Sequence, residues 1–299
     1  MTGRSRTTPT PSTDVAVDEL ATPAAAQRWS GLHRKAGQRI GFVPTMGALH
    51  DGHLHLVDVA RKHASVVVVS IFVNPIQFNQ RADFDRYPRP MDDDRGLLAD
   101  AGVDALYVPT AEVMYPAGFQ THVDPGPLAE PMEGTFRPGH FRGVATVVTK
   151  LFLAVRPDVA VFGEKDFQQV AIIRRMATDL DFGIEVVGVP TVREPDGVAM
   201  SSRNRRLGDD ERIAARCVPR ALDAARDALS SGARRSALIV AAVRQVVAAE
   251  PLARLEYAEV CHPVSLERVD LVTEPAVLAV AVWVGQVRLI DNVTLVPPI

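Results

Sequence analysis

The sequence predicts an α/β protein built on a parallel sheet, followed by a smaller α+β domain. Short β-branched runs alternate with amphipathic helical segments between residues 39 and 189. Near-continuous apolar strands between such helices are typical of a parallel sheet covered on both faces. After Pro190 this alternation stops, and two long Ala/Arg-rich helical stretches precede three strands. Ligands of parallel sheets bind at the carboxyl ends of the strands, so the segments that follow the strands are the candidate site.

The elements expected in the first domain alternate along the chain. They are strands over residues 39–43, 65–72, 105–108, 159–163 and 185–189, and helices over 53–62, 91–100, 143–155 and 166–179. In the second domain we expect helices over 209–231 and 235–249, and strands over 255–261, 276–284 and 287–296. Pro219 lacks a backbone N–H, which predicts a kink or a fresh helix start inside the first of these helices. The expected divisions are a disordered tail over 1–22, a first domain over 23–190 and a second over 191–299.

The amino-terminal tail opens Thr/Pro-rich with two arginines. It lacks the apolar segment and the small-residue cleavage site of a secretory signal. A disordered tail is the favoured interpretation. An organellar transit peptide is the alternative, which the acids Asp14, Asp18 and Glu19 disfavour.

Charge and composition exclude several classes of function. Lys and Arg number 33 against 36 Asp and Glu, and the net charge of -3 provides no general basic field for nucleic acid or an anionic membrane. The longest apolar runs, 66–72 and 276–284, are far shorter than the roughly 20 residues that span a bilayer. The two cysteines, Cys217 and Cys261, lie far apart, so we expect no disulfide framework, no zinc site and a reducing compartment.

The segment PTMGALHDGH, residues 44–53, lies between the first strand and the first helix. Backbone N–H groups and the positive end of a helix favour an anion at such a place. His50 and His53 flank Gly52, so two imidazoles can donate hydrogen bonds to one phosphate. The alternative is that both are incidental surface residues. This alternative suits His55 better, because its position in the sequence is one residue out of phase with the pair.

Two amides follow the second strand, in the segment FVNPIQF. Asn74 and Gln77 are suited to hold the hydroxyl and carboxylate groups of a substrate without neutralising a nucleophile. For Asn74 a simple Asn-Pro turn explains the residue equally well. Gln77 stands between Ile76 and Phe78 and is harder to explain by a turn.

The strand over 159–163 runs into the segment GEKDFQQ. Lys165 is suited to phosphate, while Asp166 either caps the next helix or holds a ribose or a metal-linked group. Gln168 and Gln169 are consecutive and point about 100° apart on a helix, so we expect them to have different roles.

Two further polar segments are ambiguous from sequence alone. Ser201, Ser202 and Arg203 close the loop over 194–204 and can clamp a phosphate, although most polar loops are only connections. The acids Asp92, Asp93 and Asp94 begin a helix, where stabilisation of the helix dipole is the ordinary explanation and magnesium binding the minority one.

Five motifs in order, PTMGALHDGH, FVNPIQF, RPGHFRGVATVVTKLF, GEKD and REPDGVAMSSRN, resemble those of the pantothenate synthetase (pantoate–β-alanine ligase) family of HIGH-motif nucleotidyltransferases. The resemblance covers about residues 39–292. The chain departs from the family at Phe167, where Tyr is common, at Arg206, where an aromatic residue is common, and in its longer amino-terminal tail.

The resemblance implies a Rossmann-like nucleotidyltransferase domain with a smaller carboxy-terminal lid, in a cytoplasmic homodimer. It implies an ATP- and Mg²⁺-dependent condensation of (R)-pantoate with β-alanine through pantoyl adenylate, releasing AMP and pyrophosphate. The implied partners are these small molecules, without nucleic acid or membrane.

The resemblance also assigns site residues. His53 takes the catalytic position, and His50, Lys165 and Arg203 complete the catalytic set. The implied ATP-binding residues are Met46, Gly47, Ala48, Leu49, His50, Asp51, Gly52, His53, Gly163, Glu164, Lys165, Asp166, Val192, Met200, Ser201, Ser202 and Arg203. Gln77 and Gln169 take the pantoate positions, and Gln77 also the β-alanine position. No metal ligand is assigned.

Two rival functions are open at this point. One is a nucleotidyltransferase that stops after nucleotidyl transfer, against which the two amide positions argue because they supply a carboxylate site. The other is a catalytically silent nucleotide-binding regulator, against which the intact set of basic donors argues.

Overall fold

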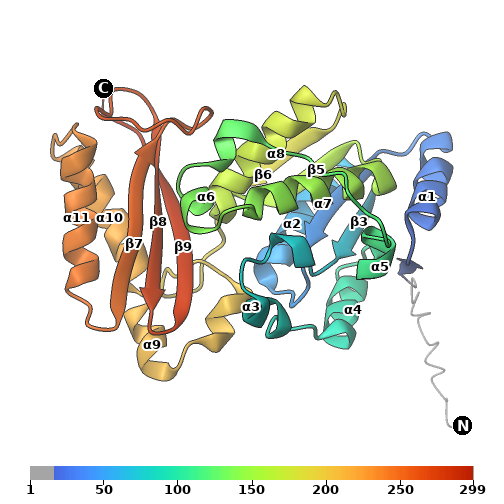
Figure 1. The fold of residues 1–299 in the computed structure, drawn as a ribbon, viewed down its shortest axis with the longest axis horizontal. Helices are drawn as coiled ribbons and strands as arrows, with labels where there is room; N and C mark the ends of the chain where they lie inside the picture. Colours follow the sequence, from blue (N-terminus) through green and yellow to red (C-terminus); the bar gives the residue numbers. More distant parts are fainter. Residues whose placement is uncertain (1–16, 299) are drawn as a thin grey trace, which may run out of the picture.

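The computed structural model describes residues 17–298 of the chain, as two units side by side (Figure 1). The larger unit is a parallel sheet with helices, and the smaller is an antiparallel sheet with helices. The predicted α/β fold with a smaller α+β unit is therefore confirmed. The part of the predicted tail over residues 1–16 lies outside the described residues.

The larger sheet has six strands in the order β1-β4-β3-β2-β5-β6, and every neighbouring pair is parallel. The chain builds outward from β2 through β3 to β4, then crosses to the other side of β2 to form β5 and β6. The order therefore reverses between β2 and β5. The strands are β1 Asp18–Leu20, β2 Ile40–Thr45, β3 Val66–Ile71, β4 Ala105–Tyr107, β5 Val159–Gly163 and β6 Glu185–Val189.

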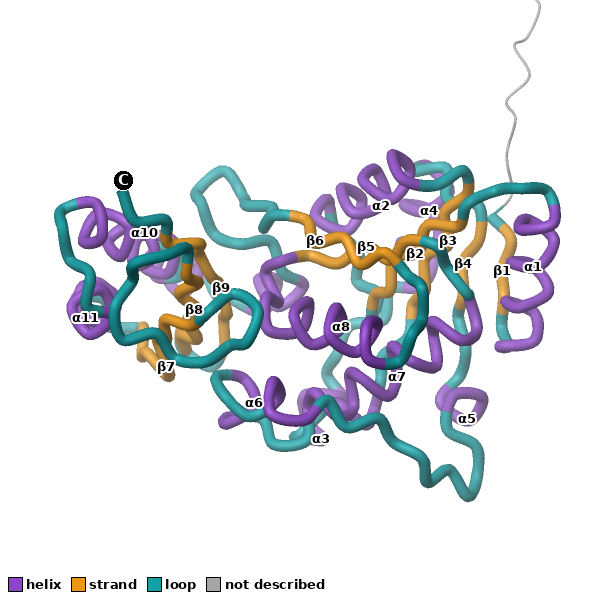
Figure 2. The backbone as a smooth tube through the Cα atoms, turned by 90° about the horizontal axis from the view of Figure 1, so that it is seen from above, coloured by secondary structure: helices purple, strands orange, loops and turns teal. Residues whose placement is uncertain are grey.

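Helices cover both faces of this sheet, as Figure 2 shows along its edge. Successive strand residues alternate between two cores: Val66 and Val68 face the core shared with α1, α7 and α8, while Val67 and Val69 face the core shared with α2 and α4. Burial on both faces explains why the strands are almost entirely apolar. The helices are α1 Pro23–Lys35, α2 Asp51–His63, α4 Met91–Asp100, α7 His140–Val155 and α8 Phe167–Asp179.

The smaller sheet is antiparallel and is also buried on both faces along its central strand, β8. Leu278, Val280 and Val282 pack against α10 and α11, whereas Ala279 and Ala281 pack toward the larger unit around Met132. Contact with a second unit therefore explains the uninterrupted apolar run of this strand. The elements are α9 Asp209–Ala214, α10 Cys217–Ser230, α11 Ser236–Ala248, β7 Ala253–Cys261, β8 Ala276–Val284 and β9 Val287–Leu295.

The structure corrects two predictions about element boundaries. The segment over 209–231, expected as one helix, forms two helices. The second, α10, starts two residues before Pro219, in agreement with the predicted fresh helix start near this proline. The expected tail over 1–22 includes strand β1, which pairs with β4 and buries Leu20. Its sequence, Asp-Glu-Leu, carries no strand pattern, because tertiary pairing outweighs local propensity there.

Several short elements have no clear signal in the sequence and connect the larger ones. They are α3 Arg81–Asp85, α5 Ala111–Met114, α6 Glu133–Phe136, and the 3-10 turns η1 Pro75–Gln77, η2 Gly126–Ala129, η3 Glu164–Asp166 and η4 Ser202–Arg206. Within the part of the chain that the structure describes, no helix combines the length and apolar character needed to cross a membrane.

Candidate active site

A cavity of about 230 Å³ lies where the strand order of the larger sheet reverses. The turns that follow β2, β3 and β5 open toward it, as expected for a ligand site of a parallel sheet. The loop between β6 and α9 closes another side. Most predicted site residues line this cavity: Met46, His50, Gly52, His53, Gln77, Gly163, Lys165, Asp166, Gln169, Val192, Met200, Ser201, Ser202 and Arg203.

Five predicted residues do not line the cavity, namely Gly47, Ala48, Leu49, Asp51 and Glu164. The carboxylate of Glu164 turns away toward Arg174, with 3.7 Å between them. Asp51 is exposed in the first turn of α2. Their neighbours in sequence reach the cavity because each turn presents only some of its residues to that side.

Asp94 holds the turn that follows β2. Its side chain is buried, and its two carboxylate oxygens accept hydrogen bonds from the backbone N–H groups of Ala48 and Leu49, each at 2.8 Å. Gly47 and Ala48 both have positive φ, and a Cβ on Gly47 would lie 2.9 Å from Asp94 Oδ2. One expectation is thereby corrected, because the N–H groups of Ala48 and Leu49 meet a carboxylate of the chain and are not available to a bound anion. Asp94 lies in the first turn of α4, as the dipole explanation requires, and also holds this turn.

His50 and His53 lie side by side at the start of α2, with 4.1 Å between their ring centroids. Among the described residues, neither buried Nδ1 atom has a hydrogen-bond partner. Burial, followed by the charges of Lys165 and Arg205, lowers the pKa of His50, and burial followed by His50 and Lys165 lowers the pKa of His53 to about 3. Both rings are therefore neutral near pH 7 and can present N–H donors to an anion. Gly52 lets them approach, because a Cβ there would lie 2.9 Å from the His50 ring.

Asn74 orients Gln77. The amide of Asn74 is buried, and its Nδ2 donates to Gln77 Oε1 at 2.8 Å and to the carbonyl oxygen of Gly143 at 3.1 Å. Tyr115 Oη donates to Asn74 Oδ1 at 2.7 Å. His140 Nδ1 donates to the carbonyl oxygen of Gln77 at 2.9 Å. Asn74 begins the turn η1 and also lines the cavity, while its side-chain amide is used to position Gln77.

The two consecutive glutamines of α8 have different surroundings, as predicted. Gln168 is buried and binds the backbone of the preceding loop at Leu128, Pro131 and Glu133. Gln169 lines the cavity. Asp166 occupies the N-cap position of α8 but makes no capping hydrogen bond, and its carboxylate lies 3.7 Å from Lys165 Nζ. The capping alternative is therefore not supported, and a ligand role of Asp166 stays a prediction.

The smaller unit anchors two of the cavity's loops, which sequence reasoning missed. Asn292 Nδ2 donates to the carbonyl oxygens of Glu164 and Lys165, at 2.7 and 3.0 Å. Asp291 is buried and accepts two hydrogen bonds from Arg193, at 2.6 and 3.1 Å. The only signal for this role in the sequence is the pair of adjacent polar residues Asp291-Asn292, which interrupts the alternation of apolar and polar residues in this strand.

Comparison with known proteins identifies the family of this chain. The family model described as Pantoate-beta-alanine ligase matches residues 18–294. The chain is 55% identical over 263 residues to pantothenate synthetase 1 of Bradyrhizobium diazoefficiens, covering 88% of this chain and 92% of that protein. It is 48% identical over 276 residues to pantothenate synthetase of Moorella thermoacetica, covering 92% and 98%.

Solved structures agree in fold. The crystal structure of pantothenate synthetase from Thermus thermophilus is similar with a TM-score of 0.86 and 46% identity, over 93% of this chain and 99% of that one. A pantoate-beta-alanine ligase from Francisella tularensis, complexed with Beta-gamma ATP and Beta-alanine, is similar with a TM-score of 0.76 and 32% identity, over 93% and 97%.

Asp94→Ala is expected to destabilise the protein by about 2–4 kcal/mol, because two buried N–H groups lose their acceptor. Asp93→Ala is the matched control: Asp93 is exposed in the same helical turn, and its loss should cost less than about 0.5 kcal/mol. Urea unfolding of both variants measures the difference. Equal stability of the two variants would contradict the assigned role of Asp94.

Gly143→Ala is expected to destabilise the protein by about 1–3 kcal/mol, although alanine ordinarily favours a helix. A Cβ at residue 143 would lie 2.6 Å from the carbonyl oxygen of Ile76 and 2.8 Å from the Cα of Gln77, so the backbone that carries Gln77 must move. Gly96→Ala, in a helical position with nothing within 4 Å, should instead be neutral or stabilising. Chemical unfolding distinguishes them, and a stabilised Gly143→Ala protein would refute the close contact.

Proposed function

This chain belongs to the pantoate–β-alanine ligase family, and we propose that it condenses (R)-pantoate with β-alanine through pantoyl adenylate, using ATP. One observation carries the proposal: a single cavity brings anion-binding groups and two substrate amides together. The anion-binding groups are His50, His53, Lys165 and Arg203, and the amides are Gln77 and Gln169.

In the first step a carboxylate oxygen of pantoate attacks the α-phosphorus of ATP. The bond from that phosphorus to the bridging oxygen breaks, and pyrophosphate leaves with the electron pair. The protein needs no nucleophile of its own and contributes by positioning the reactants and by stabilising charge on the phosphates. Neutral His50 and His53 donate hydrogen bonds, whereas Lys165 and Arg203 add positive charge.

In the second step the neutral amine of β-alanine attacks the acyl carbon of the adenylate. The bond from that carbon to the phosphate oxygen breaks, AMP leaves, and the amine loses a proton to give the amide of pantothenate. Gln77 is assigned to both pantoate and β-alanine, and Gln169 to pantoate. The hydrogen bonds from Asn74 and His140 support this by fixing the side chain and backbone of Gln77.

The remaining ATP contacts are assigned to residues of three loops. Met46, Gly52, Gly163, Asp166, Val192, Met200, Ser201 and Ser202 line the cavity beside the catalytic groups. Gly47, Ala48, Leu49, Asp51 and Glu164 contribute through the shape of the turns that carry these residues. Ala48 and Leu49 in particular hold their turn through Asp94.

Magnesium is proposed to enter with ATP. Among the described residues there is no cluster of three or more His, Cys, Asp or Glu side chains fit to bind a metal by itself. Mg²⁺ commonly takes phosphate oxygens, waters and only one or two carboxylates, and Asp166, half-exposed beside Lys165, fits that need. When bound, the ion neutralises phosphate charge.

We further propose a boundary between the units at residues 190 and 191, with the second unit acting as a lid. The support is that Asn292 and Asp291 of β9 hold loops of the cavity. A cytoplasmic homodimer is proposed from the resemblance to the family.

Exchange of labelled pyrophosphate into ATP should require pantoate and proceed without β-alanine, because adenylation precedes the attack of the amine. Addition of β-alanine should then release AMP and form pantothenate. The measurement is label incorporation with each substrate omitted in turn. Exchange that begins only once β-alanine is present would overturn the stepwise reaction.

His53→Ala should lower the rate of adenylation by about two to three orders of magnitude, the scale of one lost oxyanion-hole donor, with much less effect on ATP binding. His55→Ala is the control, since His55 is exposed on the same helix and does not line the cavity. Reaction of preformed pantoyl adenylate with β-alanine should stay near normal in both variants. A folded His53→Ala protein that adenylates at the control rate would show that the residue has another role.

A further inference from the structure

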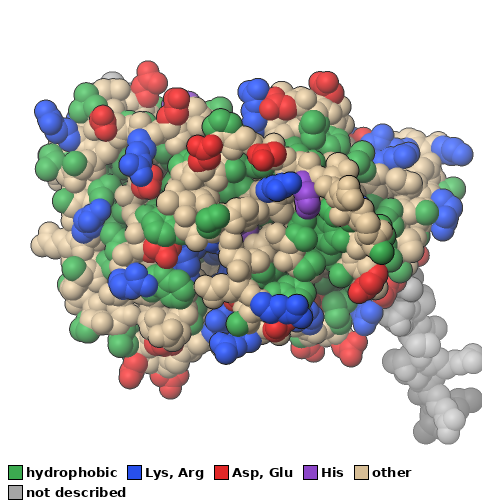
Figure 3. Space-filling model, viewed as in Figure 1, with side chains coloured by type: hydrophobic (Ala, Val, Ile, Leu, Met, Phe, Trp, Pro, Cys, Tyr) green, Lys and Arg blue, Asp and Glu red, His purple; other side chains and the backbone are tan. Residues whose placement is uncertain are grey.

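A second cleft, of about 600 Å³, lies between the two units and adjoins the cavity. Arg137, Lys165 and Arg203 line both spaces. Figure 3 shows basic side chains around the hollow between the units. The cleft therefore begins at the phosphate-binding groups and continues away from the amides that are assigned to pantoate.

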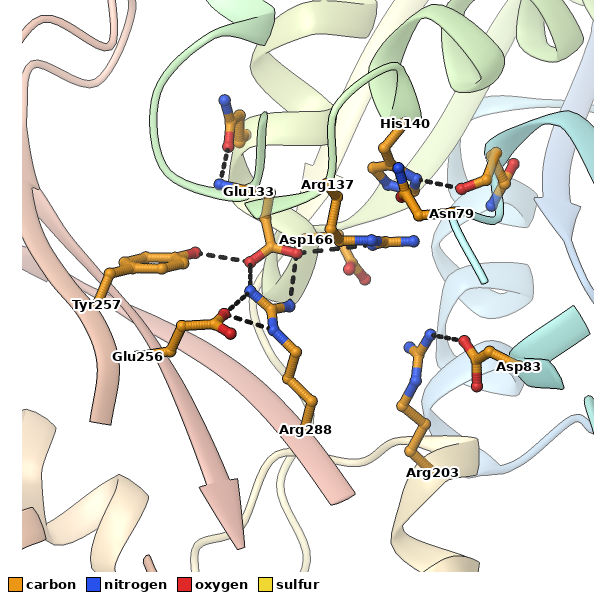
Figure 4. A network of polar contacts seen from close by, with 12 residues as sticks. Asn79, Asp83, Glu133, Arg137, His140, Asp166, Arg203, Glu256, Tyr257 and Arg288 are labelled. Atoms are coloured by element: carbon orange, nitrogen blue, oxygen red, sulfur yellow. Dashed lines mark hydrogen bonds and ion pairs between the residues drawn. The ribbon is translucent and has the colours of Figure 1, made fainter. Parts of the chain in front are cut away.

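On the wall where the smaller unit meets Glu133 of the larger one, the charges are already paired. Arg288 donates two hydrogen bonds to Glu133, at 2.7 and 2.8 Å, and one to Glu256 at 2.7 Å (Figure 4). Tyr257 Oη donates to Glu133 at 2.9 Å. Because Glu133 and Glu256 both pair with Arg288, and Glu133 also with Arg137, this wall offers little attraction to a further anion.

The opposite wall has an excess of guanidinium groups. Asp83 of α3 is the shared partner of Arg206, at 3.0 Å, and of Arg203, at 3.5 Å. Arg137 has Glu133 as its ion-pair partner among the described residues, at 3.6 Å, and shares it with Arg288. Burial, followed by the positive charge of Arg203, lowers the pKa of Arg137. Arg203 and Arg206 thus share the single carboxylate of Asp83, which balances only one of their two positive charges.

We propose that this cleft binds the pyrophosphate that leaves in adenylation, with Arg206 receiving it beside Arg203 while Asp83 gives up these two partners. The inference rests on the proposed function, because only that reaction produces pyrophosphate next to Lys165 and Arg203.

The chemistry favours such an exchange of partners. Pyrophosphate carries several negative charges and many acceptor oxygens, so it pairs with two guanidiniums better than one carboxylate does. The side chains of Asp83 and Arg206 are 27% and 38% exposed, which lets the ion pair open toward water. Asp83 also competes for the same arginines and thereby limits how tightly the product is retained.

The test is titration of the full-length protein with inorganic pyrophosphate by calorimetry, together with the pyrophosphate dependence of pantoate-dependent exchange. Arg206→Gln should raise the half-saturating pyrophosphate concentration about tenfold, the scale of one charge-assisted hydrogen bond, while the KM for ATP changes less than about twofold. Asp83→Asn should lower the half-saturating concentration several-fold because the competing carboxylate charge is gone.

Matched controls come from the same short helix. Arg81 and Asp85 pair with each other at 3.5 Å, with side chains 89% and 55% exposed, and neither lines the cleft. Arg81→Gln and Asp85→Asn should leave both pyrophosphate measurements unchanged, and circular dichroism verifies the fold of all four variants.

Three outcomes would overturn the proposal: unchanged pyrophosphate binding in Arg206→Gln, an equal loss of ATP and pyrophosphate affinity in that variant, or weaker pyrophosphate binding in Asp83→Asn. Failure of the proposed function looks different. In that case the wild-type protein shows no pantoate-dependent exchange, while calorimetry still reports whether Arg206 and Asp83 govern pyrophosphate binding.

Discussion

The parallel pairing of β2 with β5 is the constraint on which the site depends. The chain adds strands outward on one side of β2 and then returns to its other side, so the turns after these two strands open at the same edge. One turn carries the paired histidines, and the other carries Lys165 and Asp166. Residues more than 100 positions apart in the sequence thus become neighbours through backbone hydrogen bonds that involve none of their side chains.

These turns are held in place by buried polar groups whose hydrogen bonds are made within the protein. Asp94 and Asn74 each satisfy backbone or side-chain groups of a neighbouring segment. A buried polar group that loses its partner costs far more than an average hydrogen bond contributes. These hydrogen bonds therefore stabilise one arrangement of the cavity relative to all others. A single arrangement is needed to align two substrates precisely.

At the contact between the units, charged groups also fix an arrangement more than they add stability. Arg288 joins Glu133 of the larger unit to Glu256 of the smaller one, and desolvation of such a cluster offsets much of its attraction. We infer that it defines the orientation of the smaller sheet more than it adds stability. In that orientation Asn292 of β9 donates to the backbone carbonyls of Glu164 and Lys165, so the smaller unit holds a loop of the cavity in place.

The sequence by itself determined the elements and the motifs. Apolar strands such as 159–163 and 185–189 were predicted to the residue, and the polar side chains that follow the strands were identified as the candidate site, because burial and local backbone geometry leave periodic signals. Only the tertiary structure decided that Asp94 holds Ala48 and Leu49, that Asn74 orients Gln77, and that β1 pairs with β4. Apart from the Asn74–Gln77 contact, these partners lie tens of residues apart in the sequence, and even that contact depends on Tyr115 and Gly143. Which buried polar group meets which is set by the packing of distant segments, and no local pattern records it.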